Sequence, residues 1–193
     1  MMDKELLSAL AIVLTFAGFF PYIRSILKDE IKPHVFSWVI WGSSTIVVFL
    51  AQLKAGGGAG AWPIGVSGLI TSYVAGLAYL KKADISITRA DWFFFLSAML
   101  SLPLWYLTAD PLWAVVILTV VDVFGFAPTL RKAYAHPFDE NRVFFTLFMV
   151  RNLIVILALE HYSLTTVLFP AVIAAACLLL LVMITCRRRL LLS

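Results

Sequence analysis

Two halves of the chain repeat one another under a shift of 107 residues, which places Gly18 on Gly125. The matched pairs include Gly18 and Gly125, Phe19 and Phe126, Pro21 and Pro128, Arg24 and Arg131, Val48 and Val155, Leu50 and Leu157, Ala51 and Ala158, and Pro63 and Pro170. A fixed period of this kind indicates a duplicated structural unit. It constrains the fold strongly, because any architecture for this chain must contain the same unit twice.

The composition is typical of a membrane protein. Hydrophobic residues make up 62% and charged residues 13% of the 193 residues, whereas a soluble domain carries about 25% charged residues. The charges cluster between apolar stretches of ~18–24 residues, each long enough to cross a hydrocarbon core of ~30 Å. The predicted spans are 5–27, 34–53, 61–80, 91–108, 111–130, 142–160 and 163–186.

The basic residues predict the orientation of these spans. Lys4 and Lys54 fall on one side of the membrane. The other side carries Arg24, Lys28, Lys32, Lys81, Lys82, Arg89, Arg131, Lys132, Arg142, Arg187, Arg188 and Arg189. Because basic loops remain in the cytoplasm, we expect an outward N-terminus and a cytoplasmic C-terminus in a plasma or bacterial inner membrane. The same rule explains the basic pI, so the lipid bilayer is an expected partner and nucleic acid is not.

The repeat and the spans together predict the architecture. The first three-helix unit covers residues 1–82, the second covers 111–193, and a linker helix lies within 83–110. Equivalent helices are four spans apart in the chain, as the first and the fifth are, and this offset is even, so both units cross the membrane in the same direction. The expected fold is an all-α membrane protein with seven transmembrane helices, built as two parallel three-helix repeats joined by a linker helix (3+1+3). Such a chain can enclose a path by itself, as a monomer or within a homo-oligomer.

One segment of the first unit, GFFPYIRSILKDEIKPHVFSWVIW, resembles the PQ-loop superfamily, which includes the MtN3/SWEET sugar carriers and the PnuC vitamin carriers. The residues that carry the resemblance are Gly18, Pro21, Arg24, Lys28, Ser37 and Trp41. The second copy, GFAPTLRKA, repeats the first half of this signature, with Tyr22 and Thr129 where the family has glutamine. The resemblance implies a seven-helix carrier of a small sugar- or vitamin-like solute.

Pro21 and Pro128 are candidate hinges. Each lies one to two turns from the cytoplasmic end of its span, and a proline inside a helix removes a backbone hydrogen bond and produces a kink. Two symmetric kinks could open a cytoplasmic gate, and the resemblance to SWEET carriers implies the same role. The alternative is a static kink that only shapes packing. Pro63 and Pro170 are expected in the first turns of their spans, where proline is tolerated.

Asp122 and Arg151 are the ionisable residues predicted at the membrane midplane. Each costs roughly 3 kcal/mol or more at the centre of a span, so each is expected to face the interior and find a partner. We predict that they pair or share a water-filled cavity. They then form either a site for solute or protons, or a structural ion pair. Their counterparts in the first unit are the uncharged Thr15 and Ser44.

A polar and aromatic stripe on the second span is expected to face the bundle interior. It contains Trp41, Ser44 and Thr45, and its counterpart on the sixth span includes Asn152. Together with Tyr73 on the third span, these residues could stack on and hydrogen-bond a solute. The alternative for the serines and threonines is close packing between membrane helices.

The predicted function is transport by alternating access around a midplane cavity. The candidate solute-binding residues are Asp122, Arg151, Asn152, Trp41, Ser44, Thr45, Thr15 and Tyr73, and Asp122 would permit proton coupling. No nucleophile–base arrangement stands out, so we expect no enzyme activity, catalytic residue, metal ion or cofactor. The alternative is a membrane sensor or assembly protein with the same fold and no transport path.

Overall fold

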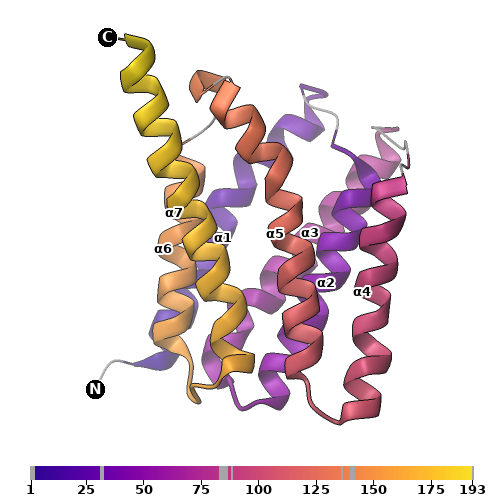
Figure 1. Ribbon diagram of the computed structural model, residues 1–193. Helices are drawn as coiled ribbons and strands as arrows, with labels where there is room; N and C mark the ends of the chain where they lie inside the picture. The colour runs from indigo at the N-terminus through magenta and orange to yellow at the C-terminus, as the bar shows by residue number, and fades with distance from the viewer. Residues whose placement is uncertain are drawn as a thin grey trace.

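The computed structural model describes residues 3–30, 33–82, 87, 89–135, 137–139 and 142–192 (Figure 1). These residues contain an α-helix in each of the seven predicted ranges, two short 3-10 helices and no β-strand. The elements are α1 (Lys4–Leu27), α2 (Val35–Lys54), η1 (Gly58–Ala61), α3 (Trp62–Leu80), α4 (Arg89–Thr108), α5 (Leu112–Ala135), η2 (Pro137–Asp139), α6 (Arg142–Ala158) and α7 (Leu164–Leu192). The prediction of an all-α protein is therefore confirmed.

Several helices are long and apolar enough to cross a membrane. Among the described residues, four segments meet this length and composition: Lys4–Leu27, Val35–Lys54, Gly58–Leu80 and Leu164–Leu192. The apolar segments Trp92–Thr108 and Leu112–Phe126 are shorter. Helices of this kind are typical of a membrane protein.

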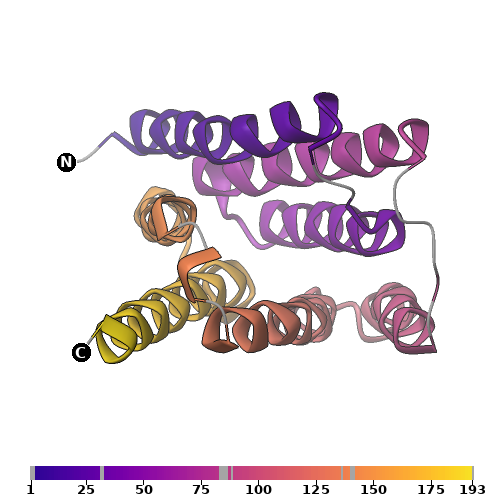
Figure 2. The same cartoon turned by 90° about the horizontal axis from the view of Figure 1, so that it is seen from above.

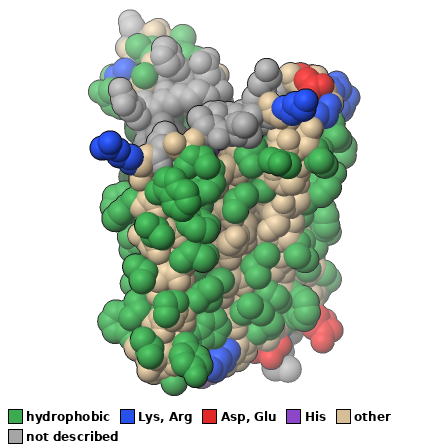
Figure 3. All heavy atoms as spheres, turned by 90° about the vertical axis from the view of Figure 1, so that its right-hand side faces the viewer, with side chains coloured by type: hydrophobic (Ala, Val, Ile, Leu, Met, Phe, Trp, Pro, Cys, Tyr) green, Lys and Arg blue, Asp and Glu red, His purple; other side chains and the backbone are tan. Residues whose placement is uncertain are grey.

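The distribution of polarity agrees with that class. Large hydrophobic side chains are exposed along the helices, while Thr15, Ser44, Gln52 and Asn152 are buried. Figure 3 shows one face, with an apolar band at mid-height and the charged side chains near the two ends. In water such a surface would aggregate, whereas lipid tails solvate it.

Local signals set the ends of α1. The carboxylate of Asp3 accepts hydrogen bonds from the backbone N–H groups of Glu5 and Leu6 at 3.0 and 3.3 Å, which caps the first turn. At the other end, Asp29 adopts a left-handed φ of 59° and its carboxylate pairs with Lys81 at 3.0 Å. This ion pair joins the end of α1 to the end of α3.

The helices pack in an order that differs from their order in the chain. Neighbouring helices run antiparallel (Figure 1), but α3 packs against both α1 and α2, and α7 packs against both α5 and α6 (Figure 2). The two groups meet where α1 contacts α6 and where α2 contacts α5. Helix α4 packs against α5 and, to a smaller extent, against α2. Helices one to three and five to seven therefore share one pattern of contacts.

The seventh helix departs most from its predicted range. It begins at Leu164, within one residue of the expected start, but it continues past the expected end at 186 to Leu192. Pro170 lies inside this helix, beyond its first turn, so the prediction that it occupies the first turn is wrong. Pro63 does lie in the first turn of α3, because η1 forms a separate 3-10 turn before it.

Candidate functional site

Arg151 is the centre of a buried hydrogen-bond network. Its side chain is 3% exposed on α6. The Nε atom donates to Thr15 Oγ1 at 3.1 Å, one terminal nitrogen donates to Asn152 Oδ1 at 3.1 Å, and the other donates to the Pro63 carbonyl at 2.6 Å. The guanidinium group thus joins α6 to α1 and to the first turn of α3.

The acceptors of this network are themselves oriented. Thr15 Oγ1 donates to the carbonyl of Ala11 at 2.8 Å, and Asn152 Nδ2 donates to the carbonyl of Phe148 at 2.8 Å. Each bond is made within the residue's own helix. It orients the side chain so that its oxygen points away from that backbone and can accept a hydrogen bond from another group. Three residues predicted as a site, Thr15, Arg151 and Asn152, are therefore brought together.

Asp122 and Arg151 do not form the predicted ion pair. Asp122 is 9% exposed on α5, and its Oδ1 atom has no hydrogen-bond partner, while the donors of Arg151 are directed to α1, α3 and Asn152. The physical reason is the packing order. Helices α5 and α6 follow one another in the chain, but α7 packs against both of them, and they share little direct contact.

The second group of predicted residues lies on α2. Ser44 is 1% exposed and its Oγ atom has no hydrogen-bond partner. Thr45 Oγ1 donates to the carbonyl of Trp41 at 2.8 Å and is therefore satisfied within its helix. The ring of Trp41 packs edge-on against Trp38, with centroids 5.7 Å apart.

Two glycines allow the halves to approach closely at equivalent positions. A Cβ atom added to Gly18 would lie 2.5 Å from the ring of Phe148, and one added to Gly125 would lie 2.7 Å from Nε1 of Trp41. Gly18 and Gly125 match under the repeat, as do Trp41 and Phe148. In both the α1–α6 and the α5–α2 contact, a glycine therefore faces an aromatic ring of the other helix.

Hydrogen bonds join the connections at the end of the bundle that holds the N-terminus. The Ala59 N–H donates to Glu160 Oε1 at 2.9 Å, and the Glu160 N–H donates to the Gly57 carbonyl at 3.2 Å. Gln52 Nε2 donates to the Thr166 carbonyl at 2.8 Å. Segments from both halves of the sequence therefore hold this end together.

Tyr73 and the two predicted hinges remain to be placed. Tyr73 is 56% exposed, so it is not brought together with the buried side chains. Pro21 lies inside α1 and leaves the carbonyl of Ala17 without its usual helical donor. The second predicted hinge, Pro128, has a side chain outside the part of the chain that the structure describes.

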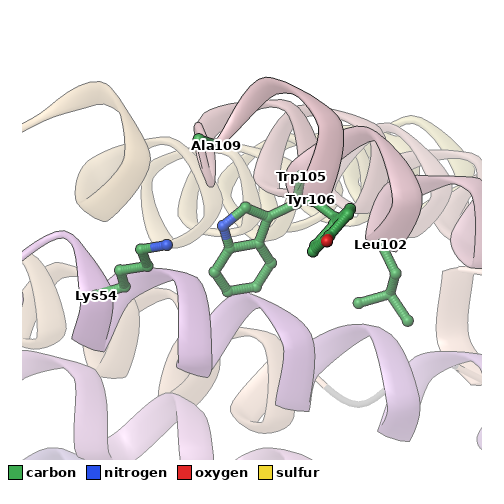
Figure 4. Close-up of a pocket in the computed structure, with 5 residues that line it drawn as sticks. All are labelled: Lys54, Leu102, Trp105, Tyr106 and Ala109. Atoms are coloured by element: carbon green, nitrogen blue, oxygen red, sulfur yellow. The ribbon is translucent and has the colours of Figure 1, made fainter.

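A pocket that the sequence analysis did not predict lies near the end of the bundle that holds the N-terminus. It has a volume of about 300 Å³ and is lined by Lys54, Leu102, Trp105, Tyr106 and Ala109 (Figure 4). The Lys54 ammonium lies 5.7 Å from the centroid of the Trp105 ring, within range of a cation–π interaction. Lys54 and Trp105 both fall near the ends of predicted spans, which is a signal in the sequence. The sequence does not show that they meet, because they lie far apart in the chain. The Pro63 carbonyl was also missed, because a backbone acceptor has no sequence signature.

Comparison with known proteins gives no family assignment. No protein-family model, curated protein or solved structure that was compared with the chain matches it.

Proposed function

We propose that the protein is a membrane transporter or facilitator of a small polar solute. The observation that carries this proposal is the location of its buried polar side chains. Thr15 and Arg151 lie where α1 meets α6, and Asp122 and Ser44 lie on the facing pair α5 and α2. Polar and ionisable groups inside a membrane bundle are costly, and they commonly mark the path of a solute between repeated units.

The architecture that fits this proposal is a parallel duplication of the PQ-loop and SWEET type. Residues 1–82 and 111–193 would be the two units, with α4 as the linker between them. The shared contact pattern of the two helix groups supports this 3+1+3 arrangement, as do the equivalent contacts of Gly18 and Gly125. The solute would then be bound between the units, and transport would proceed as they rock against one another.

The proposed location is the plasma membrane or a bacterial inner membrane, with the N-terminus outside. The basic residues support it, because most of them fall at the end of the bundle where α1 and α7 end. Lys32 and the side chains of Arg131 and Lys132 lie outside the described residues. With this orientation, the hydrogen bonds of Glu160 and Gln52 would close the outer gate, and Pro21 would lie near the cytoplasmic gate.

Uptake into liposomes tests the proposal. Purified protein is reconstituted, and sugars, nucleosides, vitamins and amino acids are screened by solid-supported-membrane electrophysiology and radiolabel counterflow. We expect uptake of at least one solute, and at least a tenfold loss of uptake in Asp122→Asn and Arg151→Ala. Arg142→Ala is the matched control, because Arg142 is exposed at the start of the same helix as Arg151. Correctly folded protein that carries no screened solute would contradict transport, and unchanged uptake in both variants would contradict the site.

The second candidate is a membrane sensor or assembly protein without a transport path. The bonds from Arg151 to Thr15 and Pro63 favour it, because a guanidinium group engaged by the protein is suited to a structural role. Under this alternative, Arg151→Ala lowers the stability of the fold and no variant changes any flux. Uptake by the wild type and by Asp122→Asn, measured on preparations shown to be folded, therefore separates the two functions.

A further inference from the structure

Two buried polar atoms on contacting helices call for a partner that the described residues do not supply. Asp122 Oδ1 on α5 and Ser44 Oγ on α2 both lack a hydrogen bond, and their side chains are 9% and 1% exposed. Burying such groups without a partner is unfavourable, most of all for a carboxylate. Gln52 Oε1 is also unpaired. Gln52 lies at a different contact, between α2 and α7, where its Nε2 atom donates to the Thr166 carbonyl.

By analogy with the α1–α6 contact, the repeat predicts that Asp122 and Ser44 lie opposite one another. In the α1–α6 contact, Gly18 packs on Phe148, and one turn further along these antiparallel helices Thr15 accepts a hydrogen bond from Arg151. In the α5–α2 contact, Gly125 packs on Trp41. Residues three apart share a helix face. One turn from the Gly125–Trp41 contact, in the same direction, are Asp122 on α5 and Ser44 on α2.

The two equivalent positions differ in charge. At the α1–α6 contact the protein supplies a cation, the guanidinium group of Arg151, and a neutral hydroxyl acceptor, Thr15. At the α5–α2 contact it supplies an acidic side chain and a hydroxyl, and no basic side chain among the described residues forms an ion pair with Asp122. The group that would complement this pair is a cation with N–H donors, placed where the guanidinium group lies in the other contact.

We propose that Asp122 and Ser44 bind the guanidinium or ammonium group of a cationic solute between α2 and α5. This inference rests on the proposed transport function and assigns its substrate class. The carboxylate of Asp122 compensates the positive charge of the solute, and Ser44 Oγ accepts one of its N–H groups. Trp41, one turn away on α2, is the nearest fluorescent reporter on that helix.

Binding of small probe ions tests the site without any need for transport. The probes are guanidinium and methylammonium at millimolar concentration, applied to purified protein in detergent. The thermal unfolding midpoint is expected to rise by roughly 3–5 °C at ten times the dissociation constant, and above that concentration to keep rising with the logarithm of the probe concentration. Urea tests the need for charge, tetramethylammonium the need for N–H donors, and sodium an inorganic cation. The proposal would be overturned if urea, tetramethylammonium or sodium raised the unfolding midpoint. It would also be overturned if neither guanidinium nor methylammonium raised it.

Variants connect the binding to the two residues. Asp122→Asn keeps the size of the side chain and should abolish the shift, while Ser44→Ala should weaken binding by about tenfold, the loss expected for one hydrogen bond. Thr119→Val is the matched control, because Thr119 is buried on α5 and its hydroxyl is bonded to the Val115 carbonyl of its own helix at 2.6 Å. Equal shifts in wild type and Asp122→Asn would overturn the assignment.

A substitution that copies the other contact gives a second, independent test. Ser44→Arg places a guanidinium group at the position that matches Arg151, so it should raise the thermal midpoint and eliminate binding of added guanidinium. A folded Ser44→Arg protein that still binds the probe overturns the proposal, and if this variant does not fold, Asp122→Asn decides. Probe binding without any liposome uptake would contradict transport and leave the site intact. Uptake of a neutral solute without probe binding would support transport and contradict the cation site.

Discussion

Arg151 stabilises the meeting point of three helices through single, well-directed hydrogen bonds. Arg151→Met removes the donors to Thr15, Asn152 and the Pro63 carbonyl and leaves these acceptors buried. Hydrogen bonds inside membrane proteins contribute roughly 0.6 kcal/mol on average, and charged donors contribute more. We therefore expect the free energy of unfolding, measured by SDS titration in detergent micelles, to fall by about 2–3 kcal/mol.

Two further variants show whether geometry or charge makes this contribution. Arg151→Lys keeps the charge but loses the planar fork of donors, so it should recover less than half of the loss. Arg142→Met, at the exposed start of the same helix, should change the free energy of unfolding by less than ~0.5 kcal/mol. Full recovery by lysine would mean that the buried charge, and not the hydrogen-bond geometry, holds the three helices together.

At the scale of elements, the two helix contacts depend on missing side chains. Gly18→Ala and Gly125→Ala each introduce a methyl group into the ring opposite, Phe148 or Trp41. Overpacking costs about 1–3 kcal/mol, offset by up to ~1 kcal/mol of helix propensity. We expect both variants to lower the free energy of unfolding by about 1–2 kcal/mol in the same SDS titration.

Gly76→Ala is the matched control for these glycines. It also lies inside a helix, but a Cβ atom added there meets nothing within 4 Å. Only the propensity term remains, so Gly76→Ala should be neutral or stabilising by up to ~1 kcal/mol. If Gly18→Ala behaves like Gly76→Ala, the α1–α6 contact is not limited by close approach.

The connection between α2 and η1 depends on Gly58 for two reasons. Gly58 has a φ of 56°, which is unfavourable for other residues, and a side chain there would overlap the carboxylate of Glu160. Gly56 has a similar φ of 77°, but its nearest neighbour would be the Cβ of His161 at 3.4 Å. We expect Gly56→Ala to cost about 1 kcal/mol of unfolding free energy and Gly58→Ala about 2–3 kcal/mol.

A double variant isolates the steric part of this cost. Adding Glu160→Ala to Gly58→Ala removes the overlap, although it also removes the hydrogen bond from the Ala59 N–H. The Gly58→Ala change should therefore cost less in the Glu160→Ala background than in the wild type. Equal costs in both backgrounds would assign the whole effect to the backbone.

At the scale of the whole molecule, the orientation in the membrane is open to direct test. Most basic residues fall at the end where α7 ends, so a C-terminal fusion should be cytoplasmic. We expect a fused green fluorescent protein to fluoresce and a fused alkaline phosphatase to remain inactive. Phosphatase activity with a dark fluorescent protein would reverse the proposed topology.

Sequence reasoning found the helices and several polar residues that are buried, such as Thr15, Ser44, Arg151 and Asn152, but not which residues meet. Hydropathy located the helices because burial in an apolar medium needs long apolar runs. It missed the last residues of α7, since Arg187–Arg189 end an apolar run without ending a helix; Arg187 Nε bonds to the Tyr134 carbonyl at 3.2 Å. The Asp122–Arg151 pairing failed because nothing local in the sequence encodes that α7 packs against both α5 and α6. Arg151 instead meets Thr15, across the two halves.

The contacts of Gly18 with Phe148 and of Gly125 with Trp41 have a consequence for how chemistry can diverge within one fold. A homodimer of a single three-helix unit would carry identical side chains at both of its interfaces, so a basic residue at one would be repeated at the other. A chain that holds both copies covalently has no such restriction. It can place Arg151 on one helix contact and Asp122 on a helix of the other, and so put ionisable groups of opposite sign at two contacts that both pack a glycine on an aromatic ring.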